Sequence, residues 1–160
     1  HVVIMGVSSC GKSTVGELLA QHTGLPFQDG DDMHPAANIE KMASGQALDD
    51  DDRKPWLESI GRFLADQEDG AIVGCSALKH SYRELIRAAA PDTVFVHLHG
   101  SYELLKERMS QRSGHFMPVS LLDSQFETLE ELRPEEAGVV LDVSATPEEL
   151  AAAAAEYLRA

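Results

Sequence analysis

The sequence contains few of the residues that several large protein classes need. Only two of its 160 residues are cysteine, Cys10 and Cys75, which excludes a disulfide-stapled scaffold, and no Cys/His spacing resembles a zinc site. No apolar run approaches the ~20 residues of a membrane-spanning helix. The chain opens directly on an apolar run at residues 1–5 with no signal peptide, and we expect a few native residues to precede it. These features predict a soluble protein of a reducing compartment.

Positive charge is also scarce. The sequence has 13 lysines and arginines against 27 aspartates and glutamates, which gives a net charge of −14. Nucleic acid and anionic membrane surfaces would repel such a chain at long range, so neither is expected as the main partner. The 43% hydrophobic content over 160 residues is enough for one domain with one core.

Short apolar runs alternate with longer stretches of helical period along the whole sequence. The predicted strands cover residues 2–5, 26–28, 71–75, 93–98 and 139–143. The predicted helices cover residues 12–22, 36–42, 55–67, 79–90, 102–111 and 121–131, with a last one from 147. This alternation predicts an α/β fold whose parallel sheet is covered on both faces. The segment 114–132 is a candidate mobile flap.

Residues 6–13, GVSSCGKS, fit the phosphate-binding pattern G-x-x-x-x-G-K-[ST] between a predicted strand and a predicted helix. Glycines let the backbone curl so that its N–H groups point at phosphate, and the following helix adds the positive end of its dipole. Lys12 would reach the outer phosphates, and the Ser13 hydroxyl would bind magnesium. A glycine turn that merely precedes a lysine does not account for the flanking strand and helix. The pattern predicts binding of ATP or GTP.

Two sequence features that are missing indicate which class of nucleotide-binding enzyme this sequence belongs to. The sequence has no N-K-x-D segment to recognise guanine, and the predicted strand at 71–75 lacks the carboxylate that usually holds magnesium opposite the loop serine. The nearest acids by position in the fold are Asp29 and Asp31, which follow the short second strand. Ligands of open parallel sheets gather at the carboxyl ends of strands. The arrangement favours a small kinase that acts on a hydroxyl group.

Seven of the 13 basic residues stand in or beside these segments, which suits a reaction that neutralises phosphate charge. They are Lys12, Arg53, Lys54, Lys79, Arg83, Arg108 and Arg112. Arg108 and Arg112 lie one helical turn apart just before a glycine, which suits a flap that closes arginines over phosphates. The acidic run 49–52 has two interpretations. It is a solvated approach to a helix that begins near Pro55, capped by Asp52 or a neighbour, or it acts directly in the site.

Together these segments resemble the gluconate kinases, a family of P-loop kinases. Besides the phosphate loop, the matching stretches are DGDDMHP (29–35), NIEKM (38–42), DDDR (50–53), PWL (55–57), CSALK (75–79), GHF (114–116) and QFETLE (125–130). They cover most of the chain in the family's order. One departure is that the family's loop often reads G-x-S-G-S-G-K-S, whereas this sequence has Ser9 in place of a glycine.

The resemblance implies a three-layer α/β/α sandwich with a five-stranded parallel sheet, similar to adenylate and shikimate kinases. It implies a single domain over 1–160, with a substrate-binding helical region at about 29–70 and a small helical lid at about 108–132. The implied reaction transfers the γ-phosphoryl group of ATP, with Mg²⁺, to the 6-hydroxyl of D-gluconate and gives 6-phosphogluconate. A cytoplasmic homodimer that feeds sugar acids into central carbon metabolism, through the pentose phosphate pathway, is implied as well.

The resemblance also suggests roles for individual residues. Asp31 would orient the substrate hydroxyl and accept its proton. Lys12 and Arg112 would act on the transferring phosphoryl group, while Ser13 and Asp29 would hold magnesium. The residues expected to surround ATP are Gly6, Val7, Ser8, Ser9, Cys10, Gly11, Lys12, Ser13, Thr14, Arg108, Arg112 and Pro147. The residues expected to surround gluconate are Asp31, His34, Arg53, Lys79, Arg83, His115 and Gln125.

Two other functions fit the same residues. One is another small-metabolite kinase on this frame, such as a shikimate or nucleoside monophosphate kinase. The other is a regulator that binds a nucleotide without transferring its phosphate. The acids Asp29 and Asp31 together with Arg112 favour turnover over binding alone, and a comparison of several acceptors separates the two kinases.

Overall fold

The structure, a computed structural model, describes residues 1–7, 10–46, 48–111 and 119–159. Within these residues five strands form one sheet in the order β2-β3-β1-β4-β5, and every neighbouring pair is parallel. The strands are β1 (Val2–Met5), β2 (Phe27–Asp29), β3 (Ile72–Gly74), β4 (Val94–His99) and β5 (Gly138–Asp142). The strand that precedes the phosphate loop is therefore central, as the family resemblance implies.

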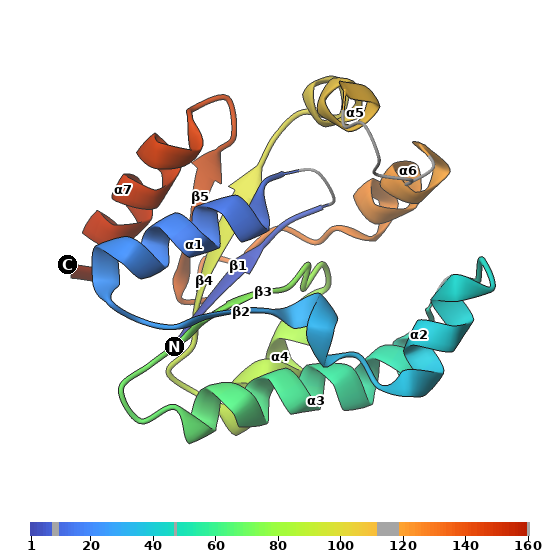
Figure 1. Ribbon diagram of the computed structural model, residues 1–160, viewed down its shortest axis with the longest axis horizontal. Coiled ribbons are helices and arrows are strands. Elements are labelled where there is room, and N and C mark those ends of the chain that lie inside the picture. The colour runs from blue at the N-terminus through green and yellow to red at the C-terminus, as the bar shows by residue number, and fades with distance from the viewer. Residues whose placement is uncertain (8–9, 47, 112–118, 160) are drawn as a thin grey trace.

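Helices cover both faces of this sheet (Figure 1). They are α1 (Lys12–Thr23), the 3-10 helix η1 (Gly30–Met33), α2 (Ala36–Ala43), α3 (Asp50–Asp66), α4 (His80–Ala89), α5 (Tyr102–Gln111), α6 (Val119–Thr128) and α7 (Pro147–Arg159). α1 and α7 pack together against one face, and α3 and α4 pack together against the other. α2, α5 and α6 lie outside these layers (Figure 1). The predicted three-layer α/β/α architecture is confirmed.

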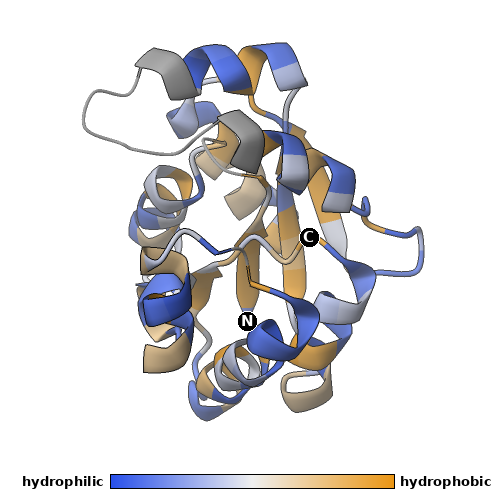
Figure 2. Cartoon of the chain, turned by 90° about the vertical axis from the view of Figure 1, so that its right-hand side faces the viewer, coloured by the Kyte–Doolittle hydropathy of each residue, from blue (hydrophilic) through white to orange (hydrophobic). Residues whose placement is uncertain are grey.

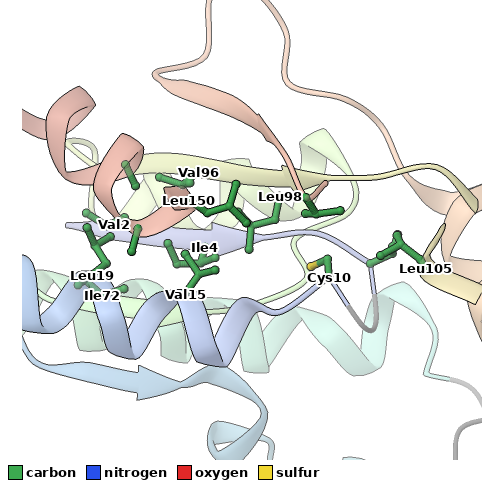
Figure 3. Packing of buried hydrophobic residues seen from close by; sticks show 14 of the residues in the cluster. Val2, Ile4, Cys10, Val15, Leu19, Ile72, Val96, Leu98, Leu105 and Leu150 are labelled. Atoms are coloured by element: carbon green, nitrogen blue, oxygen red, sulfur yellow. The ribbon is translucent and has the colours of Figure 1, made fainter. Parts of the chain in front are cut away.

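The central strand β1 contributes to both hydrophobic cores because successive side chains of a strand point to opposite faces. Val2 and Ile4 belong to the core beneath α1 and α7, where Figure 3 shows Val2 beside Leu19 and Ile4 beside Val15. Val3 and Met5 belong to the core beneath α3 and α4. Figure 2 shows the hydrophobic strands between helices whose outer sides are hydrophilic. None of the helices in the described residues is long and apolar enough to cross a membrane.

The largest difference from the predicted elements is the start of α3, which begins at Asp50 rather than near Pro55. The Asp49 side chain accepts a hydrogen bond from the backbone N–H of Asp52 at 2.8 Å, and the Asp52 carboxylate accepts one from the N–H of Asp49 at 3.0 Å. This capping box, with negative charge in the first turn, stabilises a helix N-terminus. The predicted start near Pro55 is corrected to Asp50, because residues 50–52 form the first turn, whereas the predicted capping by Asp52 or a neighbour is confirmed at Asp49.

Candidate active site

The phosphate loop begins where β1 ends, and two of its glycines adopt backbone conformations that other residues rarely take. Gly6 has a φ of 149°, and a Cβ placed there would lie 2.7 Å from both the Leu98 carbonyl oxygen and Cys10 Sγ. Gly11 caps α1 with a φ of 90°. The chain therefore folds back sharply onto the N-terminus of α1, where free N–H groups and the helix dipole favour phosphate. Ser8 and Ser9 lie outside the described residues.

Lys12 lies in the first turn of α1 and folds back toward the start of the loop. Its Nζ donates hydrogen bonds to the carbonyl oxygens of Gly6 at 3.0 Å and Val7 at 3.1 Å. The ammonium group is therefore held inside the loop, where a bound phosphate can compete with those carbonyls for its protons. Thr14, the next helical residue but one, is exposed.

The two residues predicted to hold magnesium lie side by side. The Ser13 hydroxyl donates a hydrogen bond to a carboxylate oxygen of Asp29 at 3.2 Å. The other Asp29 oxygen accepts the backbone N–H of Asp31 at 3.0 Å and so caps η1. A hydroxyl and a carboxylate are oxygen ligands of the kind that Mg²⁺ prefers. No cluster of three or more His, Cys, Asp or Glu in the described chain is placed to hold a metal, so any ion here needs phosphate and water oxygens as well.

Asp31 lies in η1, which directly follows the carboxyl end of β2. It keeps accessible surface, yet desolvation by the atoms around it raises the pKa of its carboxyl group, and the charge of Asp29 raises the pKa further. Lys12 and His34 act in the opposite direction. The structure thus brings the predicted phosphate-binding lysine, the predicted metal ligand and the predicted base within electrostatic reach of one another.

A second cluster of charges joins the start of α3 to the start of α4. The Tyr82 hydroxyl donates a hydrogen bond to Asp50 at 2.5 Å and accepts one from Arg53 at 2.9 Å. Lys79 Nζ lies 3.2 Å from both carboxylate oxygens of Asp50. The hydrogen bonds from Tyr82 and Lys79 lower the pKa of Asp50. Of the predicted gluconate-binding residues, Lys79 therefore binds the Asp50 carboxylate directly and Arg53 is linked to it through the Tyr82 hydroxyl. We name Asp50, Arg53, Lys79 and Tyr82 the carboxylate cluster.

The side chain of His34 is close to both Asp31 and Arg53, which belongs to the carboxylate cluster. Its ring stacks on Trp56 with centroids 4.0 Å apart and planes 17° apart, and Trp56 Nε1 donates to the Gly30 carbonyl at 2.8 Å. The electrostatic neighbours that act on His34 are Asp31 and Arg53. The structure therefore places His34 next to the residues predicted to bind the substrate.

Arg83 does not reach this site, and its predicted contact with substrate is corrected. The side chain is fully buried on α4: Nε donates to Glu136 at 2.8 Å and Nη1 to the Ala77 carbonyl at 2.9 Å. Arg87 donates to the same Glu136 carboxylate at 2.7 Å. Burial alone would raise the pKa of Glu136, but the hydrogen bonds lower it to about 2. We name Arg83, Arg87 and Glu136 the brace, because they tie α4 to the segment that enters β5.

Of the predicted lid, residues 108–132, the structure describes residues 108–111 and 119–132. Arg108 on α5 donates to the Val143 carbonyl at 2.7 Å, so it adjoins the turn that leads to Pro147 at the start of α7. Gln125 lies on α6. Arg112 and His115 lie outside the described residues. The structure therefore places Arg108 beside the turn before Pro147, and both residues were predicted to surround ATP.

Sequence reasoning left one group near these residues undecided and missed another. A direct role in the site was one of two interpretations of the acidic run 49–52, and Asp50 of that run accepts hydrogen bonds from Lys79 and Tyr82. His97 was treated only as a strand residue, yet it is buried, pairs in register with Met5, and its Nδ1 has no hydrogen-bond partner within the described residues. Burial, with the nearby charges of His99, Arg83 and Lys12, lowers the pKa of His97 to about 4. A histidine inside an apolar strand was the available signal.

The sequence matches a family model described as shikimate kinase over residues 8–158. Its relatives include the gluconokinase of Gluconobacter oxydans (strain 621H), 50% identical over 132 residues that cover 81% of this chain and 74% of that protein. The thermoresistant gluconokinase of Escherichia coli (strain K12) is 41% identical over 161 residues, covering 98% and 92%. This chain belongs to the gluconokinase family.

Solved structures agree with membership in the gluconokinase family. The crystal structure of a gluconokinase from Sinorhizobium meliloti 1021 superposes with a TM-score of 0.91 at 51% identity and covers 99% of this chain and 90% of that one. Shikimate kinase from Aquifex aeolicus, at 15% identity and a TM-score of 0.65, shares the fold alone. The family consists of P-loop kinases, so this member of the gluconokinase family uses ATP and a small-molecule acceptor.

Proposed function

We propose that this protein transfers the γ-phosphoryl group of ATP to the 6-hydroxyl of D-gluconate. The observation that carries the proposal is the identity of 40–50% to several gluconokinases over most of the chain. The positions of Lys12, Asp31 and the carboxylate cluster support it, because a phosphate-binding loop, an acid and paired cations lie on neighbouring elements.

The carboxylate cluster supports an acidic substrate. Lys79 and the Tyr82 hydroxyl already donate to a carboxylate, that of Asp50, and Arg53 donates to the Tyr82 hydroxyl beside it. A sugar acid offers the same chemical group, and the planar guanidinium of arginine can bind both of its oxygens. In this proposal the gluconate carboxylate competes with Asp50 for Lys79 and Tyr82, and with the Tyr82 hydroxyl for Arg53, which fixes the acid end of the substrate.

At its other end, gluconate carries the primary alcohol that is phosphorylated. If the carboxylate is fixed at the cluster, the chain length of the substrate decides which hydroxyl reaches Asp31 and the phosphate loop. Asp31 orients this hydroxyl and accepts its proton as the oxygen–phosphorus bond forms. Lys12 leaves the carbonyls of the loop for the outer phosphates and stabilises the charge that is transferred.

We further propose that Ser13 and Asp29 hold Mg²⁺ when ATP is bound. Such an ion would supply positive charge that neutralises the phosphates. Ser13 supplies a hydroxyl oxygen and Asp29 a carboxylate, while the backbone N–H of Asp31 keeps that carboxylate oriented.

The remaining predicted contacts extend the proposal to the whole ATP site and the lid. The loop residues 6–11 and Thr14 contact phosphates through their backbone, while Arg108 and the turn before Pro147 border the adenine. Residues 29–70 form the gluconate-binding region and 108–132 the lid, in which Gln125, His115 and Arg112 approach the substrates. The contact of Arg108 with the Val143 carbonyl supports the adenine assignment.

A coupled ADP-release assay across D-gluconate, shikimate, AMP and related polyols tests the proposed function. We expect turnover with D-gluconate and a phosphomonoester at its 6-position by phosphorus NMR. Turnover on shikimate or AMP instead would establish another small-metabolite kinase. ATP binding without ADP release on any acceptor would establish a nucleotide-binding regulator.

We also propose that the enzyme is a cytoplasmic homodimer whose product enters central carbon metabolism through the pentose phosphate pathway. The family resemblance is what supports this statement. Light scattering of the purified protein measures the mass directly, and the mass of a single chain would contradict the dimer.

A further inference from the structure

Asn38 is a buried polar residue of α2, with only 4% of its surface exposed. Its side-chain nitrogen Nδ2 donates a hydrogen bond to the backbone carbonyl of Asp52 at 2.9 Å. The same nitrogen lies 3.2 Å from Nδ1 of His34. Asn38 therefore connects the first turn of α3 to the imidazole ring that lies beside the proposed substrate site.

These two contacts determine the tautomer of His34. A carbonyl oxygen accepts hydrogen bonds but cannot donate them, so the Asn38 atom that faces Asp52 must be the NH₂ group. Both hydrogens of that group are donors, and the ring nitrogen that faces it must therefore offer a lone pair. A neutral imidazole whose Nδ1 accepts carries its hydrogen on Nε2.

Other contacts hold the ring in a fixed direction. The His34 ring stacks on Trp56, and Trp56 is itself anchored to the Gly30 carbonyl. Desolvation lowers the pKa of His34; the charge of Asp31 on η1 raises it and that of Arg53 on α3 lowers it. Protonation would also place an Nδ1–H against the NH₂ of Asn38. The ring is therefore neutral near pH 7, and Nε2 has no hydrogen-bond partner in the part of the chain that the structure describes.

We propose that Asn38 is a positioning residue that locks His34 as the neutral Nε2–H tautomer, so that His34 donates a hydrogen bond to a hydroxyl of the polyol substrate. The assignment of the ligand rests on the proposed function. Asp31 accepts a hydroxyl proton and Arg53 binds anions or acceptors, whereas His34 supplies a single neutral donor between them. Such a donor matches the lone pairs of a polyol chain without attracting a further carboxylate.

The tautomer is tested first in the unmodified enzyme by nitrogen-15 NMR of its histidine rings. Comparison with His34→Gln assigns the signals of His34. We expect a protonated Nε2 and an unprotonated Nδ1 across pH 6.5–8, as the network requires. A hydrogen on Nδ1 would overturn the proposal. This measurement needs no turnover, so it is independent of whether gluconate is the acceptor.

The role of Asn38 is tested by Asn38→Asp, which replaces the donor that faces Nδ1 with an acceptor. We expect the His34 hydrogen to move to Nδ1 or the ring to become protonated, and KM for gluconate to rise about fivefold to tenfold with KM for ATP unchanged. Gln46→Glu is the control, because it adds the same charge at an exposed position just after α2. An unchanged His34 spectrum and an unchanged KM in a folded Asn38→Asp enzyme would contradict the proposal.

Two substitutions of His34 separate the donor from the bulk of the ring and do not depend on the folding of the Asn38 variant. The amide of glutamine reaches the position of Nε2, whereas the shorter asparagine amide corresponds to Nδ1. We expect His34→Gln to keep KM for gluconate within about threefold and His34→Asn to raise it about tenfold. Equal KM values in these two variants would overturn the donor role, whichever acceptor the substrate panel has identified.

Discussion

The proposed active site has a nucleotide side, around the phosphate loop, and an acceptor side, around Asp31, His34 and the carboxylate cluster, and the two sides differ in composition. The nucleotide side consists of backbone: glycines with positive φ, the N-terminus of α1, and a lysine held by two carbonyl oxygens. The acceptor side consists of side chains from η1, α2, α3 and α4 that hold one another by hydrogen bonds. Backbone recognises the phosphates that all P-loop kinases share, while side chains can change to select an acceptor.

The largest effect is expected on the nucleotide side. Lys12→Ala removes the ammonium group that stabilises the transferring phosphoryl group, so we expect kcat to fall about 10³-fold. Circular dichroism should show an unchanged fold, because the hydrogen bonds of Lys12 Nζ to Gly6 and Val7 end on the loop and not on the core. Turnover near that of the unmodified enzyme would disprove the phosphate-loop assignment.

Asp31 stands where the two sides meet. Asp31→Asn keeps the shape but removes the proton acceptor, and we expect kcat to fall at least about 10²-fold while ATP still binds. Asp32→Asn is the control, since Asp32 is its exposed neighbour on η1. Equal kcat values for the two variants would remove Asp31 from the proposed reaction.

On the acceptor side the effect should appear in binding rather than in chemistry. Arg53→Met removes a charged hydrogen-bond donor, and we expect KM for gluconate to rise about tenfold or more with KM for ATP unchanged. Lys54→Met, at the exposed next position, should leave both constants unchanged. A parallel loss of ATP affinity in Arg53→Met would show that the two sides are not separate.

The sequence pattern predicted the fold almost completely because buried parallel strands read as apolar runs and the loop motif places the central strand. The start of α3 was missed because Pro55 resembles a first helical residue, whereas the capping box of Asp49 and Asp52 carries the helix further upstream. The i, i+3 spacing of Asp49 and Asp52 was the available signal, although the second residue of a capping box is usually Glu or Gln. The bounds of α2 and α4, the helices before and after α3, agree with the predicted bounds to within a few residues.

The candidate site was less predictable. Motifs identified Lys12, Ser13 and Asp29, which local geometry brings together. Arg83 was misassigned because its partner Glu136 is distant in sequence, and only the tertiary fold shows that the pair is buried. Residue type alone does not distinguish an arginine that binds substrate from one that is enclosed in the fold.

The smallest effect concerns His97, a buried residue of β4 that pairs with Met5 of β1. Its pKa is about 4 in the folded protein and about 6.5 in an unfolded chain, so the unfolded state binds the proton first as pH falls. Stability is therefore lost between about pH 6.5 and pH 4. We expect His97→Gln to reduce the loss between pH 7 and pH 5 by about 2 kcal/mol, measured by urea unfolding.

The control for His97 is His22→Gln, at an exposed position near the end of α1. This variant should retain the full dependence of stability on pH. An identical dependence in His97→Gln and His22→Gln would show that the burial of His97 does not hold the ring neutral.

The brace also limits which segments of this enzyme can be exchanged for those of a related kinase, because its ion pairs join residues far apart in the sequence. Arg83, Arg87 and Glu136 lie on both sides of residues 108–130 in the sequence but meet in space. A chimera that exchanges 108–130 as a block therefore retains the brace from one parent. A junction at residue 100 that takes everything downstream from another kinase would pair Arg83 with a foreign side chain and leave a buried charge without its partner.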